Sequence, residues 1–302
     1  MAIDQISFIG LGNMGSPMAL NLLNAGFKVT VFDLNKAAAQ AHIALGAKWA
    51  ESPSEAAATA DVLITMLPGP RQIEDVMLRQ GTADALRSGS VWIDMSTSSP
   101  EAANLVDEAS LKKRGIQRVD APVSGMVRGA TNGTLQIFVG GAEQDVERVR
   151  PIFNVLGNPE TVFHMGGHGT GYVTKIVGNQ LWFSHLVASA EVLTLGAKAG
   201  IDVELLRKTI AASPSSSRLI ERDIACVFDG DYDESFAVSL AAKDSGLCVS
   251  LGRELGVSLE LSALVEQIYR RASLSYGPRA GEMSPVKLYE DVAGIKLKPG
   301  AV

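Results

Sequence analysis

The feature that most constrains this chain is a glycine turn between an apolar strand and an amphipathic helix. Residues 8–15 read Phe-Ile-Gly-Leu-Gly-Asn-Met-Gly. In a G-x-G-x-x-G turn the first glycine permits a tight bend, the second lets a pyrophosphate approach the backbone, and the third lets helix and strand pack closely. The phosphates then meet free N–H groups at the helix N-terminus. The predicted cofactor loop consists of Gly10, Leu11, Gly12, Asn13, Met14 and Gly15.

An acid at the end of the second expected strand indicates which dinucleotide binds. Asp33 follows Gly15 by 18 positions. A carboxylate there can accept hydrogen bonds from the adenosine ribose hydroxyls and repel a 2′-phosphate. Lys36 lies near enough to weaken this discrimination without reversing it. We therefore expect NAD as the cofactor, with NADP as the less favoured alternative.

The first half of the chain alternates short β-branched runs with helix-length segments. Strands are expected at residues 5–9, 28–32, 61–66, 91–95, 117–120 and 134–140, and helices at 14–24, 36–45, 71–78 and 101–113. After residue 162 strand-like runs cease, and long apolar-periodic segments at 172–199, 236–255 and 259–273 predict helices. The expected fold class is α/β. A Rossmann-type, doubly wound parallel sheet occupies residues 1–165, and a long helix joins it to an all-helical C-terminal domain in residues 166–302.

Composition and charge narrow the expected partners. The chain has 302 residues and a formal net charge of −6, whereas nucleic-acid and anionic-membrane binders present basic surfaces. No apolar run approaches the ~20 residues that span a bilayer, and the N-terminal residues lack the basic segment of a secretory signal. We expect a cytoplasmic protein with no nucleic-acid or membrane partner. Cys226, Cys248 and the four histidines match no ligand spacing, so free thiols and no metal are expected.

Three further segments carry a family resemblance. The first motif continues as Ser-Pro-Met-Ala-Leu-Asn-Leu at 16–22. The others are Asp-Ala-Pro-Val-Ser-Gly at 120–125, Gly-x-x-Gly-x-Gly-x-x-x-Lys-x-x-x-Asn at 166–179, and Lys-Asp-Ser-Gly-Leu at 243–247. With these motifs the chain resembles the β-hydroxyacid dehydrogenases, which include 3-hydroxyisobutyrate dehydrogenase and tartronate semialdehyde reductase. The resemblance covers nearly the whole chain. It implies hydride transfer between a nicotinamide cofactor and a small 3-hydroxy acid.

The resemblance places substrate binding on the second segment. Ser124 and Gly125 match the family pattern, in which a serine hydroxyl and loop N–H groups donate to the substrate carboxylate. They open a glycine-rich stretch, expected as a loop, that runs to residue 135. The family's next glycine is Met126 here, and we expect this side chain to affect the choice of substrate. Arg128, the only cation of the loop, is expected to be solvated at the surface.

The third segment carries the implied chemistry. Oxidation of an alcohol needs a base for the hydroxyl proton, and a lysine can serve when burial or the positive nicotinamide lowers its pKa. Lys175 matches the family's catalytic lysine. Asn179, four positions later on the same helix face, is expected to hold the substrate beside it. A second asparagine that the family often carries is Gly178 here. His168 is an alternative acid/base, but we expect an ordinary loop residue, because the family position is variable.

Further cofactor contacts are expected at strand ends and in the fourth segment. Leu67, Pro68 and Thr97 follow predicted strands, at the edge where ligands of such sheets bind. The family counterpart of Thr97 contacts the cofactor, and that of Lys243 approaches its nicotinamide end. Asp244 is expected to orient a neighbouring group or to cap a helix turn.

The function expected from the sequence is an NAD-dependent dehydrogenase with Lys175 as general acid/base. Candidate substrates are 3-hydroxyisobutyrate, L-serine, D-glycerate (formed from tartronate semialdehyde) and 4-hydroxybutyrate. One alternative is an NADPH-dependent semialdehyde reductase of the same family. A catalytically silent dinucleotide-binding protein would need neither Lys175 nor Asn179, and an imine reductase generally replaces the lysine. Helices apolar on more than one face predict a homodimer or homotetramer.

Overall fold

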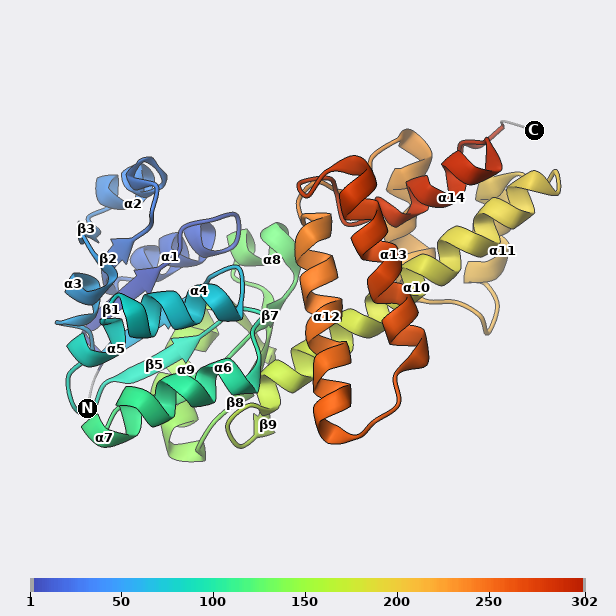
Figure 1. The fold of residues 1–302 in the computed structure, drawn as a ribbon. Coiled ribbons are helices and arrows are strands. Elements are labelled where there is room, and N and C mark those ends of the chain that lie inside the picture. The colour runs from blue at the N-terminus through green and yellow to red at the C-terminus, as the bar shows by residue number, and fades with distance from the viewer. Residues whose placement is uncertain (1–2, 301–302) are drawn as a thin grey trace. The chain divides into compact units, whose positions relative to one another are not determined.

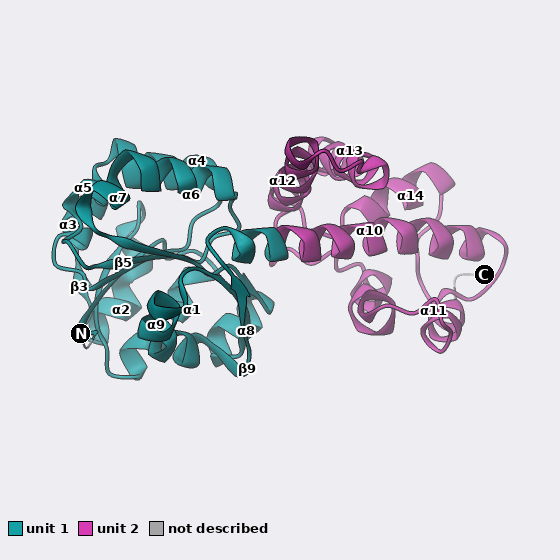
Figure 2. Ribbon diagram, turned by 90° about the horizontal axis from the view of Figure 1, so that it is seen from below, with its two compact units in different colours: residues 1–175 teal, residues 176–302 magenta. Residues whose placement is uncertain are grey.

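The computed structural model describes residues 3–300 and forms two compact units, residues 1–175 and 176–302 (Figure 2). Residues 1–2, part of the N-terminal segment inspected above, and residues 301–302 lie outside the described range. The long helix α10, Thr170–Lys198, contributes residues to both units. The boundary expected at 165/166 falls just before this helix and stays a prediction. Among the described residues, no helix combines the length and the apolarity that a bilayer crossing requires.

Within residues 3–300 the N-terminal unit is built on a nine-stranded sheet (Figure 1). The strands are β1 (Gln5–Ile9), β2 (Lys28–Phe32), β3 (Lys48–Trp49), β4 (Val62–Thr65), β5 (Val91–Asp94), β6 (Gln117–Asp120), β7 (Val123–Ser124), β8 (Leu135–Gly140) and β9 (Gly157–Gly166). Strands β3-β2-β1-β4-β5-β6 lie in this order and all run parallel. Strand β8 then pairs antiparallel with β6 and β7, and parallel with β9. The parallel part has the strand order of dinucleotide-binding sheets.

Short helices connect the strands of this unit. They are α1 (Gly15–Asn24), α2 (Gln40–Ala44), α3 (Pro53–Ala57), α4 (Pro70–Glu74), α5 (Thr82–Ala85), α6 (Pro100–Val106), α7 (Lys112–Arg114), α8 (Met126–Asn132) and α9 (Glu143–Leu156). Ser52 and Ser99 cap α3 and α6 by accepting backbone N–H groups, and a proline follows each of them. This is the start signal that favours a helix at these positions.

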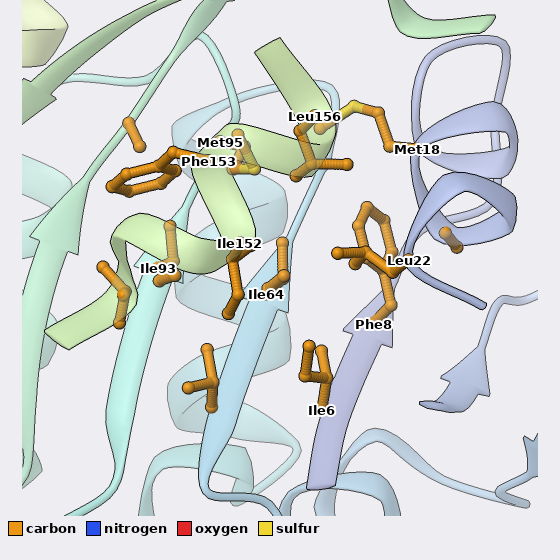
Figure 3. Packing of buried hydrophobic residues seen from close by; sticks show 14 of the residues in the cluster. Ile6, Phe8, Met18, Leu22, Ile64, Ile93, Met95, Ile152, Phe153 and Leu156 are labelled. Carbon is orange, nitrogen blue, oxygen red and sulfur yellow. The ribbon is translucent and has the colours of Figure 1, made fainter. Parts of the chain in front are cut away.

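Both faces of the parallel strands are buried. On one face, Ile6, Phe8, Ile64 and Ile93 pack against side chains of α1 and α9 (Figure 3). On the other face a second cluster includes Ile9, Leu63, Trp92 and residues of α4 and α6. Burial on both faces explains why these strands read as nearly continuous apolar runs.

The C-terminal unit is helical. Besides α10 it contains α11 (Val203–Ala211), α12 (Val238–Leu255), α13 (Glu260–Tyr276) and α14 (Pro285–Ala293), with single turns η4 (Leu219–Asp223) and η5 (Ile224–Asp229). Its core forms where α10, α12, α13 and α14 bury apolar side chains together. At its centre the rings of Phe183 and Tyr269 lie 4.9 Å apart, centroid to centroid. The α/β class with a Rossmann-type sheet and a helical C-terminal region is therefore confirmed.

Several local expectations need correction. The glycine-rich stretch after Ser124 was expected as a loop, but residues 126–132 form α8. Strand β9 was not expected, because most of its residues are exposed and lack apolar alternation; pairing with β8 holds it in place. Three expected helices are also interrupted. A 3-10 turn η1 (Lys36–Ala39) precedes α2, and single π-turns η2 (Asp75–Arg79) and η3 (Asp107–Leu111) follow α4 and α6.

Candidate active site

The glycine loop between β1 and α1 is built for close backbone approach. A Cβ atom on Gly15 would collide with the carbonyl oxygen of Gly10, so only glycine lets α1 start this close to β1. A Cβ on Gly12 would instead project into open space, with nothing within 4 Å. Gly12 and Asn13 are exposed, whereas Leu11 is buried beneath them. The loop thus leaves room over Gly12 for a phosphate, as the dinucleotide motif requires.

Asp33 lies directly beside this loop. Its Oδ2 atom accepts a hydrogen bond of 2.7 Å from the Leu11 backbone N–H, and its Oδ1 atom accepts one of 2.8 Å from Asn35 N–H. Each carboxylate oxygen has further acceptor capacity for a hydroxyl. The residue therefore ties the end of β2 to the glycine loop and keeps a negative charge there.

The loops after β4 and β5 are joined at the same edge of the sheet. Leu67 N–H donates to the Ser96 hydroxyl over 2.8 Å, and Ser96 N–H donates to Asp94 Oδ1 over 3.1 Å. Thr97 follows and is half-buried, and Pro68 is exposed. The predicted contacts Leu67, Pro68 and Thr97 thus follow neighbouring parallel strands, at the carboxyl edge where such sheets bind ligands.

The expected substrate segment combines a polar side chain with an unusual backbone. Ser124 ends β7 and is half-buried, and the next two residues are exposed. Gly125 has φ +131° and Met126 has φ +56°, both in the region that L side chains rarely adopt. Met126 is 48% exposed, so it lies at the surface, two positions after Ser124. Arg128 is exposed, as expected.

Lys175 and Asn179 lie one turn apart on α10 and are both half-buried. The amide Nδ2 of Asn179 donates to Asp244 Oδ2 over 2.8 Å, and Lys243 Nζ lies 2.6 Å from Asp244 Oδ1. Asp244 itself is 2% exposed. Within the helical unit, this buried carboxylate fixes the orientation of the Asn179 amide and holds the Lys243 ammonium.

Asp120, the residue that opens the second motif, has a structural task. Its buried carboxylate accepts the backbone N–H groups of Gly169, just before α10, and of Gly171 in the first turn of α10. Burial raises the pKa of Asp120 to about 6, opposed by these N–H groups and by the charge of Arg118. Sequence reasoning missed this contact because it joins segments 49 positions apart. Its only trace in the sequence was an acid at the end of the strand Gln117–Asp120.

Elsewhere, the described residues contain no group of three His, Cys, Asp or Glu side chains placed to hold a metal ion. His168 is exposed. Cys226 and Cys248 are free thiols, as expected.

A Rossmann-type sheet with this loop and this acid is characteristic of dinucleotide-binding oxidoreductases, the nicotinamide-dependent ones among them. Residues 5–167 match the NAD binding domain of 6-phosphogluconate dehydrogenase, and residues 169–289 match the family described as the NAD-binding domain of NADP-dependent 3-hydroxyisobutyrate dehydrogenase. The chain belongs to the β-hydroxyacid dehydrogenase family, whose members act on CH–OH groups.

Similar proteins match along almost their whole length. The 2-(hydroxymethyl)glutarate dehydrogenase of Eubacterium barkeri is 36% identical over 298 residues, which are 98% of each chain. The NAD-dependent L-serine dehydrogenase of Pseudomonas aeruginosa is 35% identical, over 97% of this chain and 100% of the other. Among solved structures, a 3-hydroxyisobutyrate dehydrogenase of Mycobacterium tuberculosis with L-serine superimposes with a TM-score of 0.86. It is 30% identical and covers 95% of this chain and 99% of its own.

Proposed function

We propose that this chain is an NAD-dependent dehydrogenase of short 3-hydroxy acids, with Lys175 as the proton-transfer group. The observation that carries the proposal is that Asn179 follows Lys175 by one turn of α10, and that the buried Asp244 holds the asparagine amide by a 2.8 Å hydrogen bond. A lysine that acts as a base needs its substrate hydroxyl held within hydrogen-bond reach. Asn179, one helical turn further along α10, is proposed to hold it.

The role of each residue follows from the chemistry of hydride transfer. When bound, the nicotinamide supplies the hydride acceptor and, in its oxidised form, a positive charge. Lys175, in its neutral form, takes the hydroxyl proton as the C–H bond gives up its hydride, and it returns that proton in the reverse direction. Ser124 donates to the substrate carboxylate. Asn179 orients the hydroxyl beside the Lys175 amine, and Asp244 keeps Asn179 in place.

The substrate class is inferred from what the similar enzymes' named substrates share. 2-(Hydroxymethyl)glutarate, L-serine and 3-hydroxyisobutyrate are the compounds named for them. All three contain the unit HOCH₂–CHR–COO⁻ and differ only in R. We infer that this chain acts on that unit, with the carboxylate at Ser124 and the primary hydroxyl at Lys175.

The preference for NAD over NADP rests on Asp33. Its carboxylate lies at the glycine loop, where it would repel a 2′-phosphate. Lys36, the nearest cation along the chain, is paired with Glu51 at 2.8 Å and lies 5.2 Å from the centre of the Trp49 ring. That ion pair is exposed and weak. In this arrangement Lys36 is paired with Glu51 and not with Asp33, so it does not offset the charge of Asp33.

We further infer a homo-oligomeric, cytoplasmic enzyme. In the helical unit several leucines of α10 and α13 are more than half exposed, which is unusual for a surface that meets only water. A second copy of the chain would cover them. The cytoplasmic location is inferred from the acidic composition alone.

A substrate panel tests the proposed reaction. Initial rates with NAD would be measured for 3-hydroxyisobutyrate, L-serine, 2-(hydroxymethyl)glutarate and D-glycerate, with 4-hydroxybutyrate as a matched control whose hydroxyl is one carbon further from the carboxylate. We expect the highest kcat/KM for a compound with the HOCH₂–CHR–COO⁻ unit. No turnover of any member with either NAD or NADP would support a binding protein without catalysis, and a preference for 4-hydroxybutyrate would overturn the inferred substrate class.

A further inference from the structure

The first turn of α10 is held by a residue far away in the sequence. Asp120, at the end of β6, accepts hydrogen bonds from the N–H groups of Gly169 (2.7 Å), Gly171 (2.9 Å) and Tyr172 (3.3 Å). The first N–H groups of a helix have no partner within the helix and are normally satisfied by a residue next to them. Here a fully buried carboxylate of the neighbouring sheet takes that place.

A second buried carboxylate holds the same turn by its side chain. The Tyr172 hydroxyl donates to Asp94 Oδ2 over 2.7 Å, and both residues are fully buried. Asp94 Oδ1 also accepts the Thr65 hydroxyl over 2.8 Å, and Thr65 in turn accepts the Trp92 indole N–H over 2.9 Å. The contact of Tyr172 is therefore part of a network that extends across the ends of β4 and β5.

The backbone is shaped to let this turn approach the sheet. A Cβ atom on Gly171 would lie 2.8 Å from the Asp120 carboxylate and would collide with the carbonyl oxygen of Phe138. A Cβ on Gly140 would collide with the same carboxylate. Glycine at both positions is thus a condition for the contact between Asp120 and α10.

We propose that Asp120 and Asp94 are positioning residues for Lys175, which they set in place by clamping the first turn of α10 onto the carboxyl edge of the sheet. Lys175 follows Tyr172 by three positions, less than one helical turn, and lies in the same compact unit as the clamp. The clamped edge also carries Leu67 and Thr97, the predicted cofactor contacts. The clamp therefore fixes the lysine relative to the edge where the nicotinamide is expected.

Two buried carboxylates are a costly way to cap a helix. Moving a charge out of water is unfavourable, and a neutral serine or asparagine next to the helix would satisfy the same N–H groups. What the carboxylates add is a strong bond between the helix and two specific strands. Small displacements of a reacting group can lower a rate by as much as about 100-fold. A helix that carries a catalytic lysine therefore needs to be fixed in place, whereas a helix with a purely structural role does not.

The experiment removes the clamp without touching Lys175, whose catalytic role is itself the proposed function. In Tyr172→Phe the Asp94 contact is lost while the ring remains. Asp120→Asn retains one acceptor oxygen in place of two. We expect each variant to lower kcat about tenfold and to leave the NAD dissociation constant within threefold. The primary deuterium isotope effect on kcat, with the carbinol carbon deuterated, should rise, because a misplaced base makes hydride transfer more rate-limiting than product release.

A double-mutant cycle separates positioning from mere stability. If Tyr172 acts through Lys175, Tyr172→Phe should lower the residual rate of Lys175→Ala by less than twofold. The matched control is Tyr232→Phe in the helical unit, where the hydroxyl also donates to a buried carboxylate, Glu290, over 2.7 Å. This control should lower the melting temperature while leaving kcat and the isotope effect unchanged.

Three results would overturn either the role of the clamp or the proposed catalytic role of Lys175, and the measurements distinguish between these two cases. If Tyr172→Phe and Asp120→Asn both keep kcat within twofold of the wild type, the clamp does not position the lysine. A tenfold loss that persists in the Lys175→Ala background has the same meaning. Full activity of Lys175→Ala itself would instead refute the proposed function, and the clamp inference would fall with it.

Discussion

At the scale of single residues, Met126 stands in a backbone conformation that suits glycine. Its φ of +56° is left-handed, where an L side chain costs roughly 1–2 kcal/mol. The family resemblance has glycine here. The chain therefore carries a strained residue two positions after Ser124, and this residue is 48% exposed.

We expect Met126→Gly to relieve this strain and to widen the substrate range. The free energy of unfolding should rise by up to about 1 kcal/mol, because the relief of strain exceeds the extra entropy of an unfolded glycine. The ratio of kcat/KM for 2-(hydroxymethyl)glutarate to that for L-serine should increase, since the larger R gains room. Met126→Val is the matched control and should be less stable than the wild type, because β-branched residues tolerate this φ worst. An unchanged substrate ratio in Met126→Gly would mean that Met126 does not contact the substrate.

Lys175→Ala tests the acid/base assignment directly. Loss of a positioned proton-transfer group should lower kcat by about 10²–10⁴. The NAD dissociation constant, measured by fluorescence titration, should stay within a few-fold, because the dinucleotide motif lies elsewhere in the sequence. A variant that retains more than about a third of the wild-type kcat would show that another group moves the proton.

We expect Asp33 to decide the preference between NAD and NADP. The wild type should show a higher kcat/KM with NAD than with NADP, and Asp33→Asn should narrow that gap by about tenfold or more, since it removes the charge that repels a 2′-phosphate. Asparagine keeps one acceptor for the Leu11 N–H, so the loop should remain anchored. The opposite wild-type preference, for NADP, would contradict the role given to Asp33.

At the scale of elements, the junction between β6 and α10 should respond to pH. Burial raises the pKa of Asp120 to about 6, against an ordinary value of 3.8. Two charged groups lie around it. Arg118 is on the same strand, and the Asp94 carboxylate binds the hydroxyl of Tyr172, whose backbone N–H donates to Asp120. Burial raises the pKa of Asp94 as well. Between about pH 4 and 6 the Asp120 carboxyl therefore holds a proton in the folded state, whereas in the unfolded chain it has lost that proton.

The sign of the effect follows from linkage. Because the folded pKa is the higher one, this group makes the free energy of unfolding fall as pH rises from about 4 to 6, by roughly 3 kcal/mol at most. Asp120→Asn should lack this decrease. Urea unfolding of wild type and variant at several pH values measures the difference. A difference between the two proteins that is constant across pH 4–7 would mean that Asp120 does not titrate in this window.

At the scale of the whole molecule, the helical unit exposes more apolar surface than a monomer needs. Leu181 and Leu195 on α10 are 58% and 70% exposed, and Leu261 and Leu274 on α13 are 63% and 88% exposed. We expect a dimer or tetramer in solution, measured by light scattering at micromolar concentration. Leu195→Glu should shift the mass downwards, whereas Leu105→Glu, at an exposed leucine of the N-terminal unit, should not. A wild-type mass near 31.8 kDa would contradict the expected oligomer.

Much of the fold could be predicted because its signals are local. The first strand, the glycine turn and the helix after it follow one another directly, and strands β1, β2 and β6 have the expected bounds. The long helix α10 begins and ends within two residues of the expected range. Helix α8 and strand β9 were missed because neither has the apolar period of its class. Helix α8 starts at Met126, which has positive φ like the Gly125 before it, and β9 is held at the sheet edge by pairing with β8.

The sequence by itself determined the dinucleotide motif, the family and the Lys175–Asn179 spacing, since each depends on residue types at fixed distances along the chain. Only the tertiary structure decided what holds those residues in place. Asp120 and Gly169 are 49 positions apart, Asp94 and Tyr172 are 78 apart, and Asn179 and Asp244 are 65 apart. Such contacts leave no periodic trace in the chain, because each partner is chosen by the packing of separate elements and not by its neighbours in sequence.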